Sequence, residues 1–434
     1  MKAPLTLFEH EYTCGFNWSD RDLTRLARLN AALGIEVLRP AVRAGCRELQ
    51  AAQYVGVVRF GERTLQVLPK IYRSIEGDKE QRAREATRNL LYLLAYAGQL
   101  PVREHALAPL LRHGSDWFEI LTRLFAAHLM EELQRGAFRT YQIVETNSPA
   151  LKGKWRIAEQ LRRPARQHLF SVAFDEFTAD NPLNRVFRFV VERLWRLTRD
   201  AGNRQMLGEL RQWMEEVALL PRVAIAEADA FRLTRLNARF APLLNLARLF
   251  LDGGALQLAA GDTQTFAFVF DMNALFESFL IEFICRHRHE ILPPTLAGCE
   301  LLPQSSGATH YLARRGSRPA FQLKPDLAFR QSDAFPLLLD AKYKRLSKED
   351  SKLGIAREDF YQMHAYAHRY ACRRVVLLYP QTAEMSQPIS ARFVIEKTDI
   401  PIIAATLNLQ IALGSKPGRD LLVNELKNIL REDA

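Results

Sequence analysis

An apolar segment that ends abruptly in charge, at residues 335–342, constrains this chain more than any other feature. Residues 335–339 are apolar, and Asp340, Ala341 and Lys342 follow directly. Alternate side chains of a strand point to opposite faces, so Asp340 and Lys342 are expected on one face and Ala341 on the other. A buried strand carries ionised residues only where they are paired or bind metal. The segment therefore predicts a central strand with a charged site at its end.

A second acidic residue lies close before this strand. Asp326 falls within Phe321–Phe329, which is predicted to be a strand, and a short turn leads to the next one. If the two strands pair antiparallel, Asp326 approaches Asp340 closely enough to share one divalent cation. Carboxylate oxygens suit Mg²⁺ or Mn²⁺, which can activate water for phosphodiester hydrolysis. Lys342 would orient or activate that water, or stabilise charge on the phosphate. The alternative is a surface hairpin with an ordinary ion pair.

The segments around this site alternate between helix and strand from about residue 266. The order αβββαβ predicts an α/β domain with a mixed central sheet. Its expected helices are Asn273–Arg288 and Arg357–Tyr370, and its expected strands are Cys299–Gln304, Phe321–Phe329, Phe335–Lys342, 375–379 and 392–397.

The length of 434 residues exceeds what one core usually holds, so two or three domains are expected. VGVVRF and TLQVLPKI flank a turn at Gly61-Glu62, as in a β-hairpin. Apolar residues then recur at helical spacing until about residue 251. We therefore expect a multidomain α+β chain with a small β domain at 1–75, a helical middle domain at 76–265 and an α/β domain at 266–434.

The charge balance favours a polyanionic partner. The chain has 60 basic and 49 acidic residues, a net charge of +11, and most of the excess precedes residue 271. One dense patch could contact DNA phosphates or could be an ordinary solvated face. Its basic residues are Lys152, Lys154, Arg156, Arg162, Arg163 and Arg166.

Other sequence features argue against a membrane or secreted protein. No stretch approaches the roughly 18 apolar residues needed to cross a bilayer, and the N-terminus has glutamates where a signal peptide has its apolar block. The five cysteines contain no CxxC pair, so neither a zinc site nor a disulfide framework is indicated. A cytoplasmic location is expected.

The constellation resembles the PD-(D/E)xK nuclease superfamily, whose three defining positions match Asp326, Asp340 and Lys342. The resemblance implies that Glu277, in LFESFLIEFI, is an additional acidic metal-site residue, with Glu282 as the less favoured choice. Gln362 and Tyr366 fit the QxxxY pattern of the helix after the catalytic strand. Gln362 would then position Lys342 or phosphate, or merely solvate its helix, and Tyr366 is as compatible with core packing.

A larger part of the chain resembles the McrC family, the nuclease subunit of McrBC restriction systems. The matching segments are YVGVVRFGERTLQVLPKI, NLLYLLAYAG, LKGKW, DEFTADNPLNRVF, KPDLAFR, LLLDAKYK and REDFYQMHAYA. The resemblance implies that the N-terminal and middle regions dock on a hexameric McrB-like AAA+ GTPase ring and stimulate it. It also implies that the C-terminal domain cuts DNA carrying modified (methylated) bases.

The absence of a GxxxxGK[ST] motif agrees with such a division, because GTP hydrolysis must then come from a partner. Two other functions stay open at this point. The chain could be a non-catalytic adaptor that activates a partner NTPase and keeps the nuclease fold as a scaffold, or it could be an autonomous nuclease.

Overall fold

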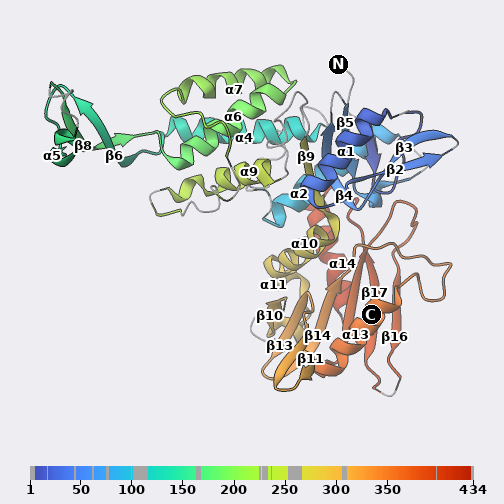
Figure 1. The fold of residues 1–434 in the computed structure, drawn as a ribbon. Helices are drawn as coiled ribbons and strands as arrows, with labels where there is room; N and C mark the ends of the chain where they lie inside the picture. The colour runs from blue at the N-terminus through green and yellow to red at the C-terminus, as the bar shows by residue number, and fades with distance from the viewer. Residues whose placement is uncertain are drawn as a thin grey trace. The chain divides into compact units, whose positions relative to one another are not determined.

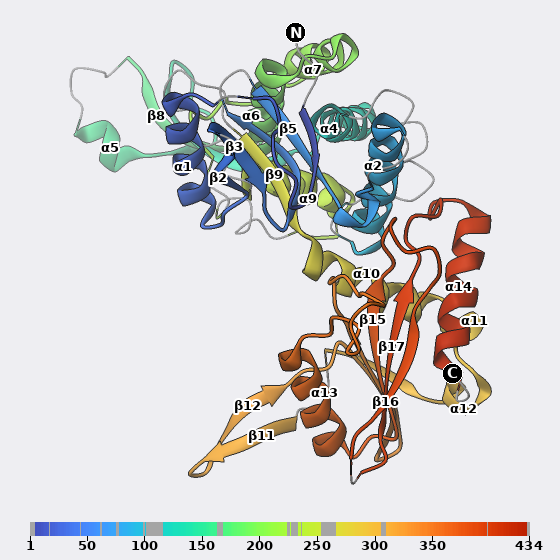
Figure 2. The same cartoon turned by 90° about the vertical axis from the view of Figure 1, so that its right-hand side faces the viewer.

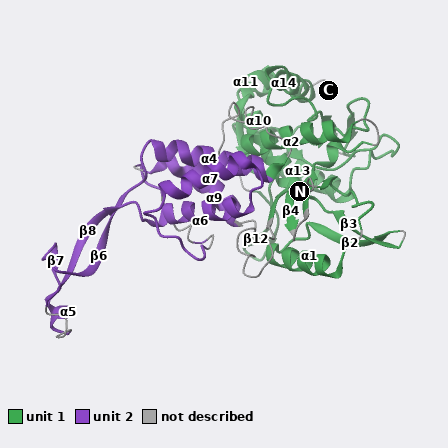
Figure 3. Ribbon diagram, turned by 90° about the horizontal axis from the view of Figure 1, so that it is seen from above, with its two compact units in different colours: residues 1–117, 265–434 green, residues 118–264 purple. Residues whose placement is uncertain are grey.

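The chain divides into two compact units. A computed structural model describes residues 5–16, 18–43, 45–60, 63–74, 78–98, 100, 116–162, 168–223, 226, 233–235, 237–252, 266–304, 310–396 and 398–431 (Figure 1). The first unit joins Met1–Trp117 with Thr265–Ala434, and the second is Phe118–Gln264 (Figure 3). Among the described residues, no helix has both the length and the apolar composition that a membrane crossing requires.

The N-terminal sheet of the first unit has the strand order β1-β5-β4-β9. Strands β4 and β5 pair antiparallel as the expected hairpin, and the turn at Gly61-Glu62 lies outside the described residues. Strand β9 follows the second unit in the sequence and pairs with β4, so the β region is not confined to residues 1–75. The elements are β1 (Leu5–Phe8), α1 (Asp20–Leu33), β2 (Leu38–Arg43), β3 (Cys46–Ala51), β4 (Tyr54–Phe60), β5 (Arg63–Leu68), η1 (Lys70–Tyr72) and β9 (Phe266–Asp271).

Helix α2 (Lys79–Tyr96) belongs to this first unit and not to a middle domain beginning at residue 76. Its buried face contacts β5 and the later helix α10 (Met272–Arg286). The Asn89 amide donates to the carbonyls of Leu409 at 3.0 Å and Ile411 at 2.6 Å. These long-range contacts explain the different boundary, because helical periodicity shows that a face is buried but not which partner buries it.

The C-terminal sheet has the order β10-β13-β14-β15-β17-β16 and is mixed, as expected. Strands β13 and β14 are antiparallel, whereas β14, β15 and β17 run parallel. Figure 2 shows α13 and α14 on opposite sides of this sheet, which explains why β15 is buried along its whole length. The elements are β10 (Glu300–Pro303), β13 (Leu327–Gln331), β14 (Ala334–Ala341), α13 (Arg357–Tyr370), β15 (Val375–Pro380), β16 (Ser390–Val394), β17 (Pro401–Leu407) and α14 (Lys416–Leu430), with α11 (Arg288–Ile291) and α12 (Pro294–Ala297) following α10.

The strand expected at Phe321–Phe329 is in fact two strands. β12 (Arg318–Leu323) pairs with β11 (His310–Arg315) in a separate hairpin, and β13 starts only at Leu327. Pro325 lies in the gap between the two strands. Proline has no backbone N–H to donate, so within a paired strand it would remove one hydrogen bond of the ladder. Asp326 therefore lies at the entry to β13 and not within a strand.

The second unit combines helices with a three-stranded arm (Figure 3). Its helices bury large aromatic residues, among them Phe125, Phe187 and Phe250. The arm has the strand order β6-β8-β7, which the expectation of a purely helical middle region did not include. The elements are α4 (Trp117–Gln134), β6 (Thr140–Ser148), β7 (Lys154–Trp155), α5 (Ile157–Leu161), β8 (Phe170–Thr178), α6 (Pro182–Leu197), α7 (Ala201–Trp213), η5 (Ala238–Phe240) and α9 (Ala241–Asp252).

Candidate active site

The antiparallel pairing of β13 with β14 brings two buried aspartates together. Leu327 lies opposite Leu339, so Asp326, one residue before β13, is beside Asp340. Asp326 is 7% exposed and Asp340 is 1% exposed. The backbone N–H of Ala341 donates to Asp326 Oδ2 at 2.7 Å, which holds this carboxyl against the end of β14.

Burial and mutual repulsion make both carboxyls difficult to ionise. Burial raises the pKa of Asp326 well above its usual range, and the negative charges of Asp340 and Glu277 raise it further. Burial also raises the pKa of Asp340, although the Lys342 ammonium opposes this. Two like charges in a buried site are stabilised by a cation between them. The pair therefore has the electrostatics of a cation site.

Lys342 follows β14 directly and turns toward Asp340. Its Nζ lies 2.7 Å from Asp340 Oδ2, and its side chain is 21% exposed. Burial alone would lower the pKa of Lys342, but the charge and hydrogen bond of Asp340, together with the charges of Asp326 and Asp359, raise it overall. Lys342 is therefore held as an ammonium, the form that stabilises negative charge.

Glu277 reaches the same site from helix α10. Its negative charge contributes to the raised pKa of Asp326, and its Oε1 accepts from Gln304 Nε2 at 3.3 Å. Glu282 instead forms an ion pair with Arg286 at 2.6 Å on the same helix. The structure thus brings Glu277, rather than Glu282, to the aspartates.

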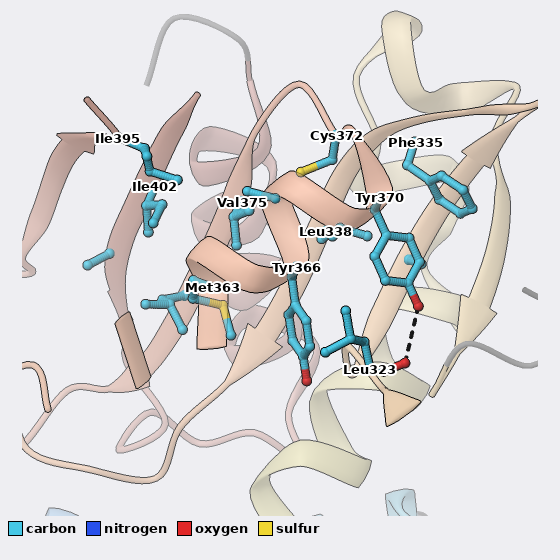
Figure 4. Packing of buried hydrophobic residues seen from close by; sticks show 14 of the residues in the cluster. Leu323, Phe335, Leu338, Met363, Tyr366, Tyr370, Cys372, Val375, Ile395 and Ile402 are labelled. Carbon is cyan, nitrogen blue, oxygen red and sulfur yellow. Dashed lines mark hydrogen bonds between the residues drawn. The ribbon is translucent and has the colours of Figure 1, made fainter. Parts of the chain in front are cut away.

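Gln362 and Tyr366 lie one turn apart on α13 and bond to each other. Gln362 Nε2 donates to Tyr366 Oη at 2.8 Å, and that hydroxyl donates to the carbonyl of Lys324 at 2.9 Å. Tyr366 also packs in the core between α13 and the sheet (Figure 4). The Gln362–Tyr366 pair thus holds the backbone just before Asp326, and Tyr366 makes this contact while it packs in the core.

One ion pair near the site has no sequence motif of its own. Lys344 Nζ lies 3.0 and 2.7 Å from the two carboxyl oxygens of Asp359, in the first turn of α13. Asp359 is 6% exposed, and its charge contributes to the raised pKa of Asp340. The alternation in DAKYK marks Lys344 as sharing a face with Lys342, but nothing in the sequence joins it to Asp359.

The residue between these lysines, Tyr343, is anchored to the N-terminal sheet. Its hydroxyl donates to Glu9 Oε2 at 2.9 Å, and the same oxygen accepts the backbone N–H of Lys70 at 2.9 Å. Lys70 Nζ donates to the Tyr343 carbonyl at 2.8 Å. The Tyr343 ring also lies 5.7 Å from that of Phe276, the neighbour of Glu277. Glu9 and Lys70 therefore fix the position of Tyr343, which follows Lys342 in the chain and contacts the neighbour of Glu277.

We expect Glu9 to make the stability of the protein pH-dependent. Burial raises its pKa from 4.5 to about 7, with Lys70 opposing the shift. Because the folded pKa exceeds the unfolded one, the stabilisation is complete below pH 4.5 and is lost as the pH rises through 7, a change of about 3 kcal/mol. Glu9→Gln should therefore gain stability relative to wild type over this range, as measured by urea unfolding.

The exposed residue Glu349 supplies the matched control. Glu349→Gln should differ from wild type by the same small amount at every pH. If the difference between Glu9→Gln and wild type also stays constant from pH 4.5 to 8, Glu9 does not carry the pH dependence.

The basic patch lies in the second unit, whereas the aspartates lie in the first. Arg156 pairs with both Glu145 and Glu159, which neutralises it, and Lys152 Nζ stacks 3.8 Å from the Phe174 ring centre. Lys154 and Arg162 are exposed, and Arg163 and Arg166 lie outside the described residues. Contacts of this patch with DNA stay a prediction.

The donors at the aspartate pair fit a hard cation. In the described part of the chain, no three His, Cys, Asp or Glu side chains are grouped to hold a metal ion. Mg²⁺ needs only one or two carboxylates when water and phosphate oxygens complete its shell. Asp340 Oδ2 is buried and lies 2.7 Å from the Lys342 ammonium, so a cation bound at Asp340 would share this carboxyl with Lys342.

Comparison with known proteins identifies the family. This protein is similar to a chain in the half-complex from a tetradecameric assembly of Thermococcus gammatolerans McrB AAA+ hexamers with bound McrC. The match covers 98% of this protein and 100% of that chain, with a TM-score of 0.74 and 24% sequence identity. A chain in the cryo-EM structure of the Thermococcus gammatolerans McrBC complex matches over 66% of this chain and 88% of its own, with a TM-score of 0.53 and 26% identity. These neighbours are McrC chains.

No curated protein matches the sequence. The model of the McrBC 5-methylcytosine restriction system component family matches residues 49–380, which is most of the chain. This protein therefore belongs to the McrBC 5-methylcytosine restriction system component family.

Proposed function

We propose that this chain is the DNA-cutting subunit of a McrBC-type restriction system, with a PD-(D/E)xK site that depends on Mg²⁺ or Mn²⁺. The observation that supports this most directly is the buried pair Asp326 and Asp340 with the Lys342 ammonium 2.7 Å from Asp340. Such a pair is costly to bury unless it serves a cation. Membership of a restriction-system family makes DNA the expected substrate.

The residues of the site divide the work of phosphodiester hydrolysis. Asp326 and Asp340 would hold the cation, and Glu277 would orient Asp326 or complete the site. A bound Mg²⁺ would neutralise phosphate charge and acidify a water molecule. Lys342, kept charged by Asp340, would stabilise the charge that develops on the phosphate. Gln362 would act indirectly, since its hydrogen bond runs to Tyr366 and from there to the backbone before Asp326.

A GTPase ring is the proposed partner. One solved relative comes from an assembly of McrB AAA+ hexamers with bound McrC, and the other from a McrBC complex. This chain has no P-loop motif of its own. The arm of the second unit exposes large apolar side chains, as a docking surface does. They include Tyr141 at 73%, Ile143 at 71%, Leu161 at 76% and Phe177 at 53% exposure. We propose that this arm docks on the ring and stimulates its GTP hydrolysis.

Cleavage of a plasmid carrying methylated cytosine tests the proposal. We expect cleavage only with this chain, a McrB-type GTPase, GTP and Mg²⁺ present together. Cleavage without partner and nucleotide would support an autonomous nuclease. Stimulated GTP hydrolysis without any cleavage would support the adaptor, the third function that the sequence left open.

The apolar side chains of the arm should be needed for association with the GTPase ring but not for folding of the chain. We expect Tyr141→Ser with Ile143→Ser to weaken association with the ring by about 10- to 100-fold, which corresponds to the loss of one or two interface anchors. Sedimentation with the purified GTPase measures it. Val42→Ser removes a side chain of equal exposure, 75%, from β2 and should leave association unchanged. Equal effects of both changes would contradict docking through the arm.

A further inference from the structure

The segment that leads to Asp326 is entirely free of acidic residues. No aspartate or glutamate occurs between Glu300 and Asp326. Within this segment β11 and β12 form a two-stranded hairpin that projects from the sheet (Figure 2). Three exposed arginines surround its tip, Arg314, Arg315 and Arg318, and the exposed Lys324 follows its base. This surface carries positive charge without compensation from its own sequence.

The arrangement of these arginines is unfavourable without an anion. Arg315 lies directly opposite Arg318 across the two strands, a like-charge pair that destabilises a hairpin. No ion pair joins Arg314, Arg315 or Arg318 to a carboxylate among the residues that the structure describes. An anionic ligand would remove this repulsion. Relief of this repulsion favours binding of an anion to the hairpin, in addition to the attraction by its net charge.

The base of the hairpin is fixed to the helix that borders the candidate active site. Arg369 Nε on α13 donates to the Tyr311 carbonyl at 2.9 Å, and Tyr370 Oη donates to the Leu323 carbonyl at 3.3 Å (Figure 4). The His310 and Tyr370 rings lie 4.2 Å apart. Only two residues then separate Leu323 from Asp326. Whatever the hairpin binds is therefore held at a set distance from the aspartates.

Apolar contact area lies on the face of the hairpin that carries Arg314, opposite the face of Arg315 and Arg318. Leu312 is 55% exposed and Phe321 is 74% exposed. Phe321 has a φ of 59°, a left-handed conformation that is strained for an aromatic residue. Backbone strain of this kind persists only where the surrounding structure imposes it, and it clusters at ligand-binding and active sites. An exposed ring beside arginines suits a ligand with both phosphates and bases.

We propose that the β11–β12 hairpin enters a groove of duplex DNA and anchors it through Arg314, Arg315 and Arg318. This rests on the proposed nuclease function and names the surface that holds its substrate. A two-stranded ribbon fits the major groove. Its six-residue strands span about 20 Å, so the tip reaches phosphates up to roughly six base steps from the aspartates. An acidic protein would explain the arginines but not the connection to the catalytic strand.

The salt dependence of DNA binding tests the proposal without any need for cleavage. Binding of a fluorescent 30-base-pair duplex is measured by anisotropy in EDTA, for wild type and for Arg314→Gln, Arg315→Gln and Arg318→Gln combined. Each phosphate contact contributes about 0.9 to the slope of log K against log salt, so the slope should fall by about 2 to 3. The melting temperature should not fall, because the change removes a like-charge pair.

Three further variants decide between explanations. The combined Arg→Lys changes at the same positions keep the charge and should largely restore the slope. Arg21→Gln, Arg28→Gln and Arg84→Gln remove three exposed charges from α1 and α2. This combined variant should keep most of the wild-type slope. The proposal is overturned if the hairpin variant keeps the wild-type slope, or if Lys152, Lys154, Arg156 and Arg162 carry the slope instead. Loss of ring association with normal DNA binding would also overturn it.

Discussion

Asp340→Asn is expected to reduce DNA cleavage at least about 1,000-fold, a loss of about 4 kcal/mol of transition-state stabilisation. The substitution keeps the shape of the side chain but removes the charge that would hold a cation. It also removes the partner that keeps Lys342 charged 2.7 Å away. Two contributions therefore fail together. The rate of plasmid nicking with Mg²⁺, GTP and the McrB-type partner measures the effect.

Asp333→Asn is the matched control, since Asp333 is exposed in the turn between β13 and β14. It should cleave at the wild-type rate. Asp340→Asn should also keep its fold, because a neutral side chain at a 1% exposed position relieves the repulsion with Asp326. The proposed stimulation of GTP hydrolysis in the partner should not depend on this carboxylate. Undiminished cleavage by a well-folded Asp340→Asn protein would show that the aspartate pair is not the active site.

Gly56→Ala should destabilise the first unit by about 4 kcal/mol or more, which lowers its melting temperature by roughly 10 °C. Gly56 has a φ of 137°, which L side chains rarely adopt. An added Cβ would lie 1.8 Å from the Phe268 carbonyl oxygen and 2.8 Å from its carbon. Since these are backbone atoms of β9, relief requires β4 and β9 to move apart. Thermal unfolding followed by circular dichroism measures the loss.

The same substitution at Gly298 provides the comparison, because a Cβ there meets nothing within 4 Å and the backbone is unstrained. Gly298→Ala should change the melting temperature little. The effect of Gly56→Ala should extend to activity as well, because Asp271 ends β9 and caps α10, the helix that carries Glu277. Equal stability of the two variants would mean that the β4–β9 contact adapts without cost.

The candidate site was predictable from the sequence in its chemistry and its local geometry. Acidic residues at the ends of neighbouring apolar segments indicate a carboxylate pair, and period-two alternation places Lys342 on the face of Asp340. The structure brings these side chains together as that pattern requires. Helical periodicity alone does not distinguish Glu277 from Glu282. The charge of Glu277 acts on Asp326, whereas Glu282 forms an ion pair with Arg286, and this difference separates the two.

Other parts of the site depend on contacts that no local pattern records. The anchoring of Tyr343 by Glu9 joins residues 334 positions apart, and the pairing of Lys344 with Asp359 joins a loop to a helix. The hairpin at β11–β12 escaped prediction because its strands are short, charged and exposed, so they lack the apolar alternation that marks a half-buried strand. The lack of acidic residues is visible in the sequence, but the facing of Arg315 and Arg318 across the two strands is not.

The sequence by itself determined most elements of the C-terminal sheet, the grouping of two aspartates with a lysine and the likeness to one family, since all three are written in short-range order along the chain. Only the tertiary structure decided which elements share a core. Strand β9 joins the N-terminal sheet and α2 joins the first unit. An apolar face can pack against any partner of complementary shape, and here the partners are separated by up to hundreds of residues in the sequence. Periodicity reports that a surface is buried, whereas only folding selects what covers it.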